Sequence, residues 1–270
     1  MPVSSENISD ALQRTGLAGR PVMVHSSLRS FGSLVGGTQA ILDPFLDHGC
    51  TVMVPTFSHV YVIPPPEGQR LERNYPDDEA FDEPVRGRDM VYTCDSQEID
   101  TPMGALPVAL LAMEGRARGY HPLCSFSAVG PAAHDLVASQ SPLDIYGPAR
   151  ELARMDGLVV LMGVGLTRVT ALHYAEQLAG RELFRKWANG LDGQPIPVAV
   201  GGQAHGFHKL DPIVYPMETR IEVGSGLWRI FPAQALLQQG SDAMRKDPMA
   251  THCAYEDCRP CNEATDEGPR

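Results

Sequence analysis

Apolar runs alternate with an amphipathic stretch near the beginning of the chain. The runs 21–28 and 50–58 have the length of buried strands. The stretch 36–49 between them opens with glycines and Thr38 and carries apolar residues at helical spacing; Pro44 within it predicts a kinked or shortened helix. A strand, a helix and a strand joined by short connections form a βαβ unit, so we expect a largely parallel central sheet.

The same periodicities extend along the rest of the chain. The run 158–165 is the most convincing buried strand. Further helices are expected at 5–16, 101–115, 148–157 and 232–247, and in 120–138 after an initial loop. Short apolar runs separated by Gly, Pro and Asp in 194–231 predict antiparallel strands. The predicted fold class is α/β: a central mixed, largely parallel sheet flanked by helices, with extra antiparallel strands in the C-terminal part.

Residues 59–100 interrupt this pattern with many prolines, many charges and weak periodicity. Within 72–100 there are ten acidic residues against three basic ones. A segment of this length without regular structure is either a disordered insertion or a functional lid. Because no linker divides the chain, we expect one domain over 1–270 that carries this insertion at about 59–100.

The formal net charge of −11 makes some classes of binding partner less favourable than others. An acidic surface repels nucleic acid and anionic membranes and can attract a cationic ligand. The N-terminus has no basic region followed by an apolar one, and no apolar run approaches the length of a membrane span. We therefore expect a cytoplasmic protein that binds neither nucleic acid nor membrane.

Three of the six cysteines cluster near the C-terminus. His252 and Cys253 precede the pair Cys258 and Cys261, and this Cys-x-x-Cys set is typical of zinc sites. Only one such pair is present, so a loose terminal segment is the alternative, and no metal is expected for the function. The remaining three are scattered, as free thiols are in a reducing compartment; they are Cys50, Cys94 and Cys124.

The stretch VHSSLRSFGSLVGG (24–37) joins a predicted strand to a predicted helix. Backbone N–H groups of such a turn suit a phosphate or a polar chain. The stretch matches neither a Walker motif nor Gly-x-Gly-x-x-Gly, so a plain tight connection is the alternative. His25 ends the strand, where open α/β sheets place functional groups.

The stretch TALHYAE (170–176) predicts the start of a helix after the central apolar run. If Thr170 is the N-cap, His173 occupies the third helical position, where the helix dipole disfavours the imidazolium. The ring would then stay neutral and able to accept a proton, and Glu176 shares its face. Packed core, a metal ligand set and a catalytic base are the three interpretations.

A cysteine nucleophile is a further hypothesis, because Cys124 lies in the polar stretch 120–130. Nothing in the neighbouring sequence predicts a helix N-terminus that would favour its thiolate. A buried small residue is therefore the alternative for Cys124.

Taken together, these stretches resemble the aminoglycoside 3-N-acetyltransferase family, antibiotic acetyltransferases distinct from the GNAT fold. The matching pieces extend from about residue 8 to residue 261. In order, they are VHSSLRSFGSLVGG, GCTVMVPTFS, TPMGALPVAL, HPLCSFSAVGP, SPL, GLVVLMGVG, TALHYAE and the tail DP…C…CRPC.

The resemblance implies an antibiotic acetyltransferase-like fold and direct transfer of acetyl from acetyl-CoA to an amine in a ternary complex. His173 would be the general base, with Glu176 beside it and His25 facing the site. The residues implied for CoA are Ser26, Ser27, Leu28, Arg29, Ser30, Phe31, Gly32, Val35, Gly36, Thr38, Met103, Gly104, Ser125 and Phe126. Those implied for a polycationic aminoglycoside are Thr56, Asp77, Asp78, Asp100, Glu176 and Asp211.

Two departures from the family pattern keep other functions open. The acidic segment has no clear counterpart, and GSGLWRIFPAQAL (224–236) lacks the acidic residue that many members carry before the corresponding arginine. The alternatives are the same chemistry on another amine, such as an amino-sugar or amino-phosphonate metabolite, a hydrolase using Ser26 or Cys124, and a binding module without catalysis. CoA and a cationic amine are the expected small-molecule partners, and the chain is expected to be a monomer or a homodimer.

Overall fold

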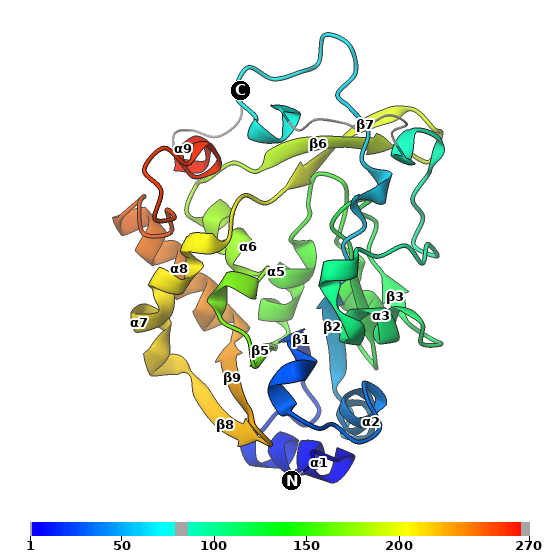
Figure 1. Cartoon of the computed structure of the whole chain (residues 1–270), viewed down its shortest axis with the longest axis vertical. Helices are drawn as coiled ribbons and strands as arrows, with labels where there is room; N and C mark the ends of the chain where they lie inside the picture. The colour runs from blue at the N-terminus through cyan, green and yellow to red at the C-terminus, as the bar shows by residue number, and fades with distance from the viewer. Residues whose placement is uncertain (1, 79–85, 266–270) are drawn as a thin grey trace.

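The computed structural model describes residues 2–78 and 86–265, and a seven-stranded sheet lies at its centre (Figure 1). The strands of this sheet are β1 Pro21–Ser26, β2 Thr51–Pro55, β3 Ala117–Arg118, β4 Phe126–Val129, β5 Leu158–Met162, β8 Thr219–Val223 and β9 Gly226–Pro232. Their spatial order is β3-β4-β2-β1-β5-β9-β8. A separate hairpin consists of β6 Phe184–Asn189 and β7 Pro195–Val200.

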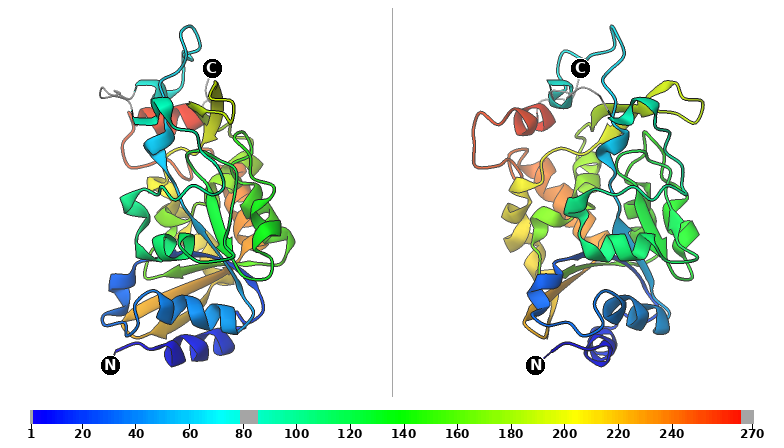
Figure 2. Two further views of the ribbon diagram at one scale, coloured as in Figure 1. Left: turned by 90° about the vertical axis from the view of Figure 1, so that its right-hand side faces the viewer. Right: turned by 45° about the vertical axis from the view of Figure 1, so that its right-hand side comes forward.

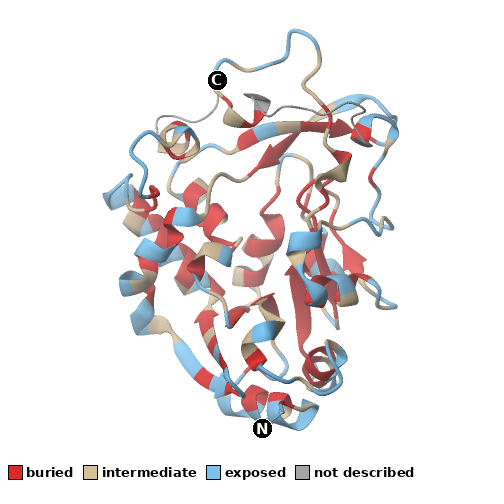
Figure 3. Ribbon diagram, in the orientation of Figure 1, coloured by how far each residue is buried: buried red, intermediate tan, exposed pale blue. Residues whose placement is uncertain are grey.

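Parallel pairing is confined to the three central strands of this mixed sheet. Strand β1 pairs in parallel with β2 on one side and β5 on the other. The outer pairings, β2 with β4, β3 with β4, β5 with β9 and β8 with β9, are antiparallel. The predicted mixed sheet and the antiparallel C-terminal strands are therefore confirmed. All five residues of β2 and of β5 are buried, as expected of parallel strands covered on both faces (Figure 3).

Helices cover the two faces of the sheet, because successive side chains of a strand point to opposite faces. The helices are α1 Ser5–Thr15, α2 Gln39–Asp47, α3 Ala105–Leu111, α4 Ala133–Val137, α5 Gly147–Arg154, α6 Leu172–Leu178, α7 Asp211–Val214, α8 Ala233–Lys246 and α9 Arg259–Thr265. Val22 and Val24 of β1 join an apolar cluster with α1, α2 and α3. Met23 joins the cluster that includes α4, α5, α6 and α8. Figure 2 shows this layering from two further sides.

Most predicted helices are confirmed, including the shortened helix around Pro44, and two predictions need correction. The stretch 101–115 is not one helix: a 3₁₀ turn ends at Gly104, whose φ of +88° breaks the helical path before α3. The stretch 120–138 contains the strand β4, which the sequence analysis missed. Its residues read FSAV, and their strand state depends on pairing with β2, which is distant in sequence.

The carboxyl ends of β1, β2 and β5 lie together on the side of the sheet where the hairpin β6–β7 is placed, opposite α1 and α2 (Figures 1 and 2). Gly163 follows β5 there with a φ of +67°, and a Cβ at this position would lie 2.0 Å from the Ser30 hydroxyl. Only glycine fits both constraints, so the loops after β1 and β5 can approach each other closely.

The C-terminal end of the segment 59–100 is fixed to the sheet by Arg118, which is buried. Its guanidinium donates hydrogen bonds to the carbonyl oxygens of Ser96, Glu98 and Thr56. This end of the segment is therefore an ordered part of the fold. Among the described residues, no helix is both long and apolar enough to cross a bilayer.

Trp228 gives a direct test of the packing between the sheet and α2. It is fully buried, with ring centroids 6.1 Å from both Phe31 and Phe45. We expect Trp228→Ala to lower the free energy of unfolding by about 3–5 kcal/mol, because it opens a cavity in this cluster. The measurement is urea denaturation followed by circular dichroism.

The neighbouring Leu227 provides the matched control, since its side chain is 39% exposed on the same strand. Leu227→Ala should cost less than about 1 kcal/mol. Equal losses for the two variants would contradict the packing described for Trp228.

Candidate active site

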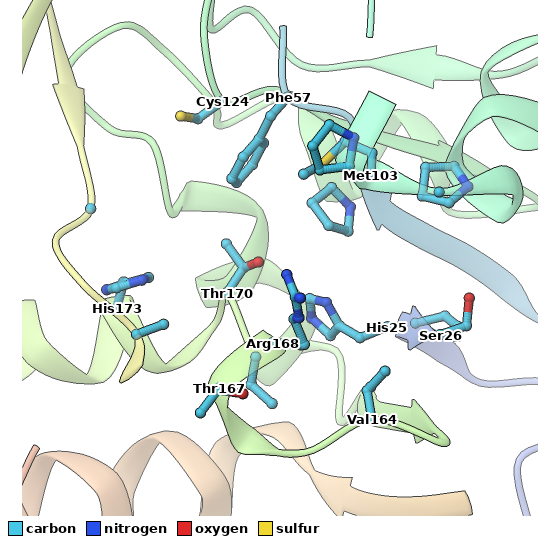
Figure 4. Close-up of a pocket in the computed structure, with 18 of the residues that line it drawn as sticks. His25, Ser26, Phe57, Met103, Cys124, Val164, Thr167, Arg168, Thr170 and His173 are labelled. Carbon is cyan, nitrogen blue, oxygen red and sulfur yellow. The ribbon is translucent and has the colours of Figure 1, made fainter. Parts of the chain in front are cut away.

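A cavity of about 890 Å³ lies at the carboxyl ends of β1, β2 and β5. This is where open α/β sheets usually bind ligands. Figure 4 shows His25, Arg168, Thr170 and His173 on one side of the space, and Phe57, Met103 and Cys124 across from them. The loops after three different strands and the start of α6 therefore meet at one site.

His173 is the most constrained histidine of this cavity. Helix α6 begins at Leu172 with Ala171 as its N-cap, so His173 is the second helical residue rather than the third. Its Nδ1–H donates to Glu176 Oε2 at 2.6 Å, and Arg181 donates to Glu176 Oε1 at 2.6 Å. The side chains of all three are at most 10% exposed. With Nδ1 occupied by the carboxylate, Nε2 is the ring nitrogen left for chemistry.

Aromatic rings and a glycine hold the imidazole of His173 in place. The ring of Tyr146 stacks on it at 5.9 Å with an interplanar angle of 17°, and Phe207 packs at 4.8 Å. A Cβ on Gly201 would lie 2.3 Å from the Tyr146 hydroxyl and 3.1 Å from the imidazole. Burial raises the pKa of Tyr146 well above its ordinary value, so the stacked ring stays a neutral phenol.

His25 contributes a neutral imidazole from the end of β1. Burial lowers its pKa to about 4, so it carries no charge at neutral pH. Its Nε2 is buried and has no hydrogen-bond partner within the described parts of the chain. A buried polar nitrogen without a hydrogen bond costs free energy. At the wall of a cavity, a ligand can remove this cost by donating a hydrogen bond to the nitrogen or accepting one from it.

His59 forms a second histidine–carboxylate pair in the cavity wall. Its Nδ1–H donates to Asp100 Oδ2 at 2.6 Å, and its backbone N–H donates to Asp100 Oδ1 at 2.9 Å. Burial lowers the pKa of His59, but the hydrogen bond with Asp100 and the contact with the Cys124 side chain outweigh burial and raise it to about 10. Cys124 therefore faces the protonated ring of His59, a charged neighbour that the residues next to Cys124 in the sequence do not provide.

Only some of the residues that the family resemblance implies for CoA line the cavity. Ser26, Ser27, Leu28 and Arg29 line the cavity, as do Met103 and Gly104. The other implied residues do not line it; they are Ser30, Phe31, Gly32, Val35, Gly36, Thr38, Ser125 and Phe126. Phe31 packs on Trp228 because it points into the core below the loop. The Ser125 hydroxyl lies 3.1 Å from that of Thr56, and both residues are buried next to the paired ends of β2 and β4.

The residues implied for the substrate are more scattered. Thr56 is fully buried within hydrogen-bonding distance of Ser127, and Asp100 bonds His59; neither lines the cavity. Asp211 is bonded to Arg229 at 2.6 Å, also outside the lining. Glu176 has both oxygens bonded within the protein. The side chains of Asp77 and Asp78 lie outside the part of the chain that the structure describes.

The charged groups in the described lining are cationic. They are Arg29, Arg168, Lys186 and His59, and no carboxylate belongs to the described lining. Arg168 and Thr167 follow β5, so the carboxyl end of the predicted central strand was the signal that could have identified them. Further lining residues that the sequence analysis missed are Phe57, Tyr75, Tyr146, Gly201 and Gly202.

A family model described as aminoglycoside 3-N-acetyltransferase matches residues 23–245. Aminoglycoside N(3)-acetyltransferase IX of Micromonospora chalcea is 36% identical over 186 residues, which are 66% of this chain and 63% of that protein. The match thus spans less than two thirds of that relative's length.

Two solved structures share the fold. The apoenzyme of aminoglycoside acetyltransferase AAC(3)-IVa superposes with a TM-score of 0.78 and 19% identity, covering 99% of this chain and 98% of that one. AAC-IIIb, solved as a binary complex with CoASH, gives a TM-score of 0.74 and 21% identity, covering 91% and 97%. At these identities the structures establish the likeness of the folds.

The raised pKa of His59 generates a prediction about charge in the cavity. We expect the His59 ring to stay protonated through pH 8, with a midpoint near 10, and Asp100→Asn to bring the midpoint down towards the ordinary value of 6.5. The measurement is an NMR titration of the ring, assigned with His59→Gln. The pKa of His59 is higher in the folded chain than in the unfolded chain, so protonation of His59 stabilises the fold. This contribution is fully present below pH about 6.5 and is lost as the pH rises through about 10.

Asp95→Asn is the control, since Asp95 is exposed in the same segment. It should leave the His59 titration unchanged. A wild-type midpoint near 6.5 would show that Asp100 does not hold the proton on His59.

Proposed function

The chain belongs to the aminoglycoside 3-N-acetyltransferase family, and from this premise we propose that it is an acyltransferase moving acetyl from acetyl-CoA to an amine of an aminoglycoside. The observation that carries the proposal is the buried set His173, Glu176 and Arg181, of which His173 lines the cavity; its Nε2 has no hydrogen bond within the described parts of the chain. The cavity volume of about 890 Å³ is compatible with a pantetheine arm and a sugar ring together.

The reaction is a nucleophilic attack of a neutral amine on the thioester carbon. His173 Nε2 takes the proton that the amine nitrogen loses as the new C–N bond forms. The C–S bond then breaks, and the CoA thiolate leaves and takes the proton from the His173 imidazolium, which restores the neutral base. Because both reactants occupy one cavity, the attack is in effect unimolecular, which lowers its entropic cost.

Glu176 acts in this scheme as a positioning residue. Its carboxylate fixes the tautomer of His173 and stabilises the imidazolium that forms when Nε2 takes the proton. Arg181 occupies the other carboxylate oxygen at 2.6 Å and prevents the acid from rotating away. Both oxygens are therefore engaged within the protein, which favours orientation of His173 over direct binding of the substrate amine.

The cationic side of the cavity suits the phosphates of CoA. Arg29 follows β1 and Arg168 follows β5, and both are exposed at the lining. Guanidinium groups bind phosphate oxygens in a fork geometry. We place CoA along Ser26 to Arg29, because these residues line the cavity beside Arg168. The structurally similar AAC-IIIb was solved as a binary complex with CoASH, which supports CoA as the donor but not its position.

The developing oxyanion needs hydrogen-bond donors, and backbone N–H groups near Ser26 and Ser27 are the first candidates. The N–H of Ser27 donates to the Met162 carbonyl at 2.9 Å, so it is already engaged. Nε2 of neutral His25 is the buried, unpaired group at the same strand end. We assign His25 a hydrogen bond to the acetyl or amine group.

A second candidate function keeps the chemistry and changes the amine. The described lining carries cations and no carboxylate, and this charge suits an anionic amine such as an amino-phosphonate better than a polycation. A panel of amines separates the two: thiol release from acetyl-CoA is measured with several aminoglycosides and with anionic amines. Turnover on anionic amines alone would overturn the aminoglycoside assignment.

The same assay without amine tests a hydrolase. Cys124 lies beside His59, which is bonded to Asp100, and such an array can activate a thiol for attack on a thioester. Thiol release that needs no amine and is abolished by Cys124→Ser would indicate hydrolysis through Cys124. Dependence on an amine supports the transferase.

His173→Ala tests the base directly. We expect kcat to fall by about 10²- to 10⁴-fold, because the amine loses its proton acceptor, while acetyl-CoA still binds with an unchanged Kd. Turnover is followed by thiol release and binding by isothermal titration calorimetry. His134→Ala, a substitution at an exposed histidine of α4, is the control and should match the wild type. Unchanged turnover in His173→Ala would remove the residue from the mechanism.

Glu176→Gln tests positioning separately from proton transfer. Removing the charge should lower kcat by about 10²-fold or more with little change in KM, because His173 stays in place but its imidazolium loses its partner. The acidic limb of the pH profile of kcat/KM should move to lower pH, because the imidazolium has lost the carboxylate that stabilises it. The exposed neighbour Glu182 supplies the control variant Glu182→Gln. A KM effect without a kcat effect would point instead to substrate binding.

A further inference from the structure

A second cluster of chemically active side chains lies in the C-terminal segment, outside the cavity. One ligand atom from each of His252, Cys253 and Cys261 lies within 4.8 Å of the others. These residues are 4%, 8% and 5% exposed. Thiols and an imidazole gathered in a buried place are a soft donor set of the kind that transition metals prefer.

Cys258 completes the set. Its side chain is in hydrogen-bonding contact with those of both Cys253 and Cys261. Cys258 ends a turn, in which its N–H donates a hydrogen bond to the Tyr255 carbonyl at 3.1 Å. Helix α9 begins directly afterwards at Arg259. Cys258 is therefore the candidate for a fourth ligand beside the three gathered residues.

The His252 ring has a hydrogen-bond partner at each nitrogen. Nδ1 lies 3.0 Å from the Cys253 carbonyl oxygen, and Nε2 lies 2.8 Å from the Asn262 side-chain oxygen. A metal-bound imidazole normally donates its other N–H to a carbonyl, which fixes the ring. Whichever nitrogen binds an ion, the other still has an oxygen acceptor.

We propose that His252, Cys253, Cys258 and Cys261 bind one Zn²⁺ ion in a closed, tetrahedral, structural site. Binding deprotonates the three thiols and releases three protons, and no electron transfer is involved. Thiolates at about 2.3 Å from zinc lie about 3.8 Å apart, so the group His252, Cys253 and Cys261, whose ligand atoms lie within 4.8 Å of one another, needs only a small contraction. Four protein ligands leave no open position for water, so the ion stabilises the fold rather than catalysing a reaction.

The zinc site would brace the cavity on two sides. Thr251, next to His252, accepts a hydrogen bond from Arg181 at 2.6 Å, and Arg181 holds Glu176. Within α9, Glu263 accepts the Tyr75 N–H at 2.8 Å, and Tyr75 lines the cavity. Figure 1 shows α9 beside the strand β6 and near the end of α8. An ion holding 252–261 together therefore fixes both Arg181 and the Tyr75 wall.

The experiment is metal analysis of the full chain, purified without a histidine tag or chelator. We expect about one zinc per chain by plasma mass spectrometry. Removing it with a chelator should lower the thermal midpoint by about 5 °C or more, and zinc should restore it. Cobalt(II) substitution should give the visible absorption of a tetrahedral thiolate site. None of these readouts needs a substrate, so their failure would leave acetyl transfer untouched.

Variants locate the ion. Cys261→Ser and Cys253→Ser should lose most of the bound zinc, whereas Cys94→Ser, at an exposed thiol outside the cluster, should keep it. If the cluster variants do not fold, the cobalt spectrum of the wild type decides. Absence of metal and of the cobalt spectrum, or a disulfide among the three clustered cysteines in the freshly purified protein, would overturn the proposal.

Discussion

The hydrogen bond between His173 and Glu176 is the interaction on which the rest of the site depends. A buried carboxylate is stable only when it is paired, and Glu176 has two partners, His173 and Arg181. Arg181 in turn bonds Thr251, so the orientation of the imidazole extends to the C-terminal segment. The stacked Tyr146 and the close approach of Gly201 restrict the ring. The result is one ring nitrogen presented to the cavity in a fixed direction.

The sheet explains why this nitrogen meets a ligand. Parallel strands bring their carboxyl ends to one edge, so the loops after β1, β2 and β5 supply Arg29, His59 and Arg168 to the same space. The antiparallel hairpin and the loop that follows it close the opposite wall with Lys186 and Gly202. The described lining of the cavity is cationic, whereas the chain as a whole has a formal net charge of −11. A cosubstrate with several phosphates fits the cationic lining of the cavity.

Local pattern predicted the central strands, most helices and the His173–Glu176 pair, because these depend on periodicity and on neighbours along one helix. The strand β4 and the role of His59 could not be predicted in that way, since both depend on partners distant in sequence. Cys124 faces His59 only after folding, so the sequence near Cys124 gave no sign of a charged neighbour. Phe31 and Asp211 were implied by the family resemblance, but a core ring and an arginine partner hold them away from the cavity.

A crystal structure with CoA and an acceptor amine bound together tests the central claim most directly, because it shows what Nε2 of His173 faces. We expect the amine nitrogen within about 3.5 Å of Nε2, the CoA sulfur beyond it, and the phosphates near Arg29 and Arg168. An amine bound away from His173, or an acetyl group found on Cys124, would contradict it.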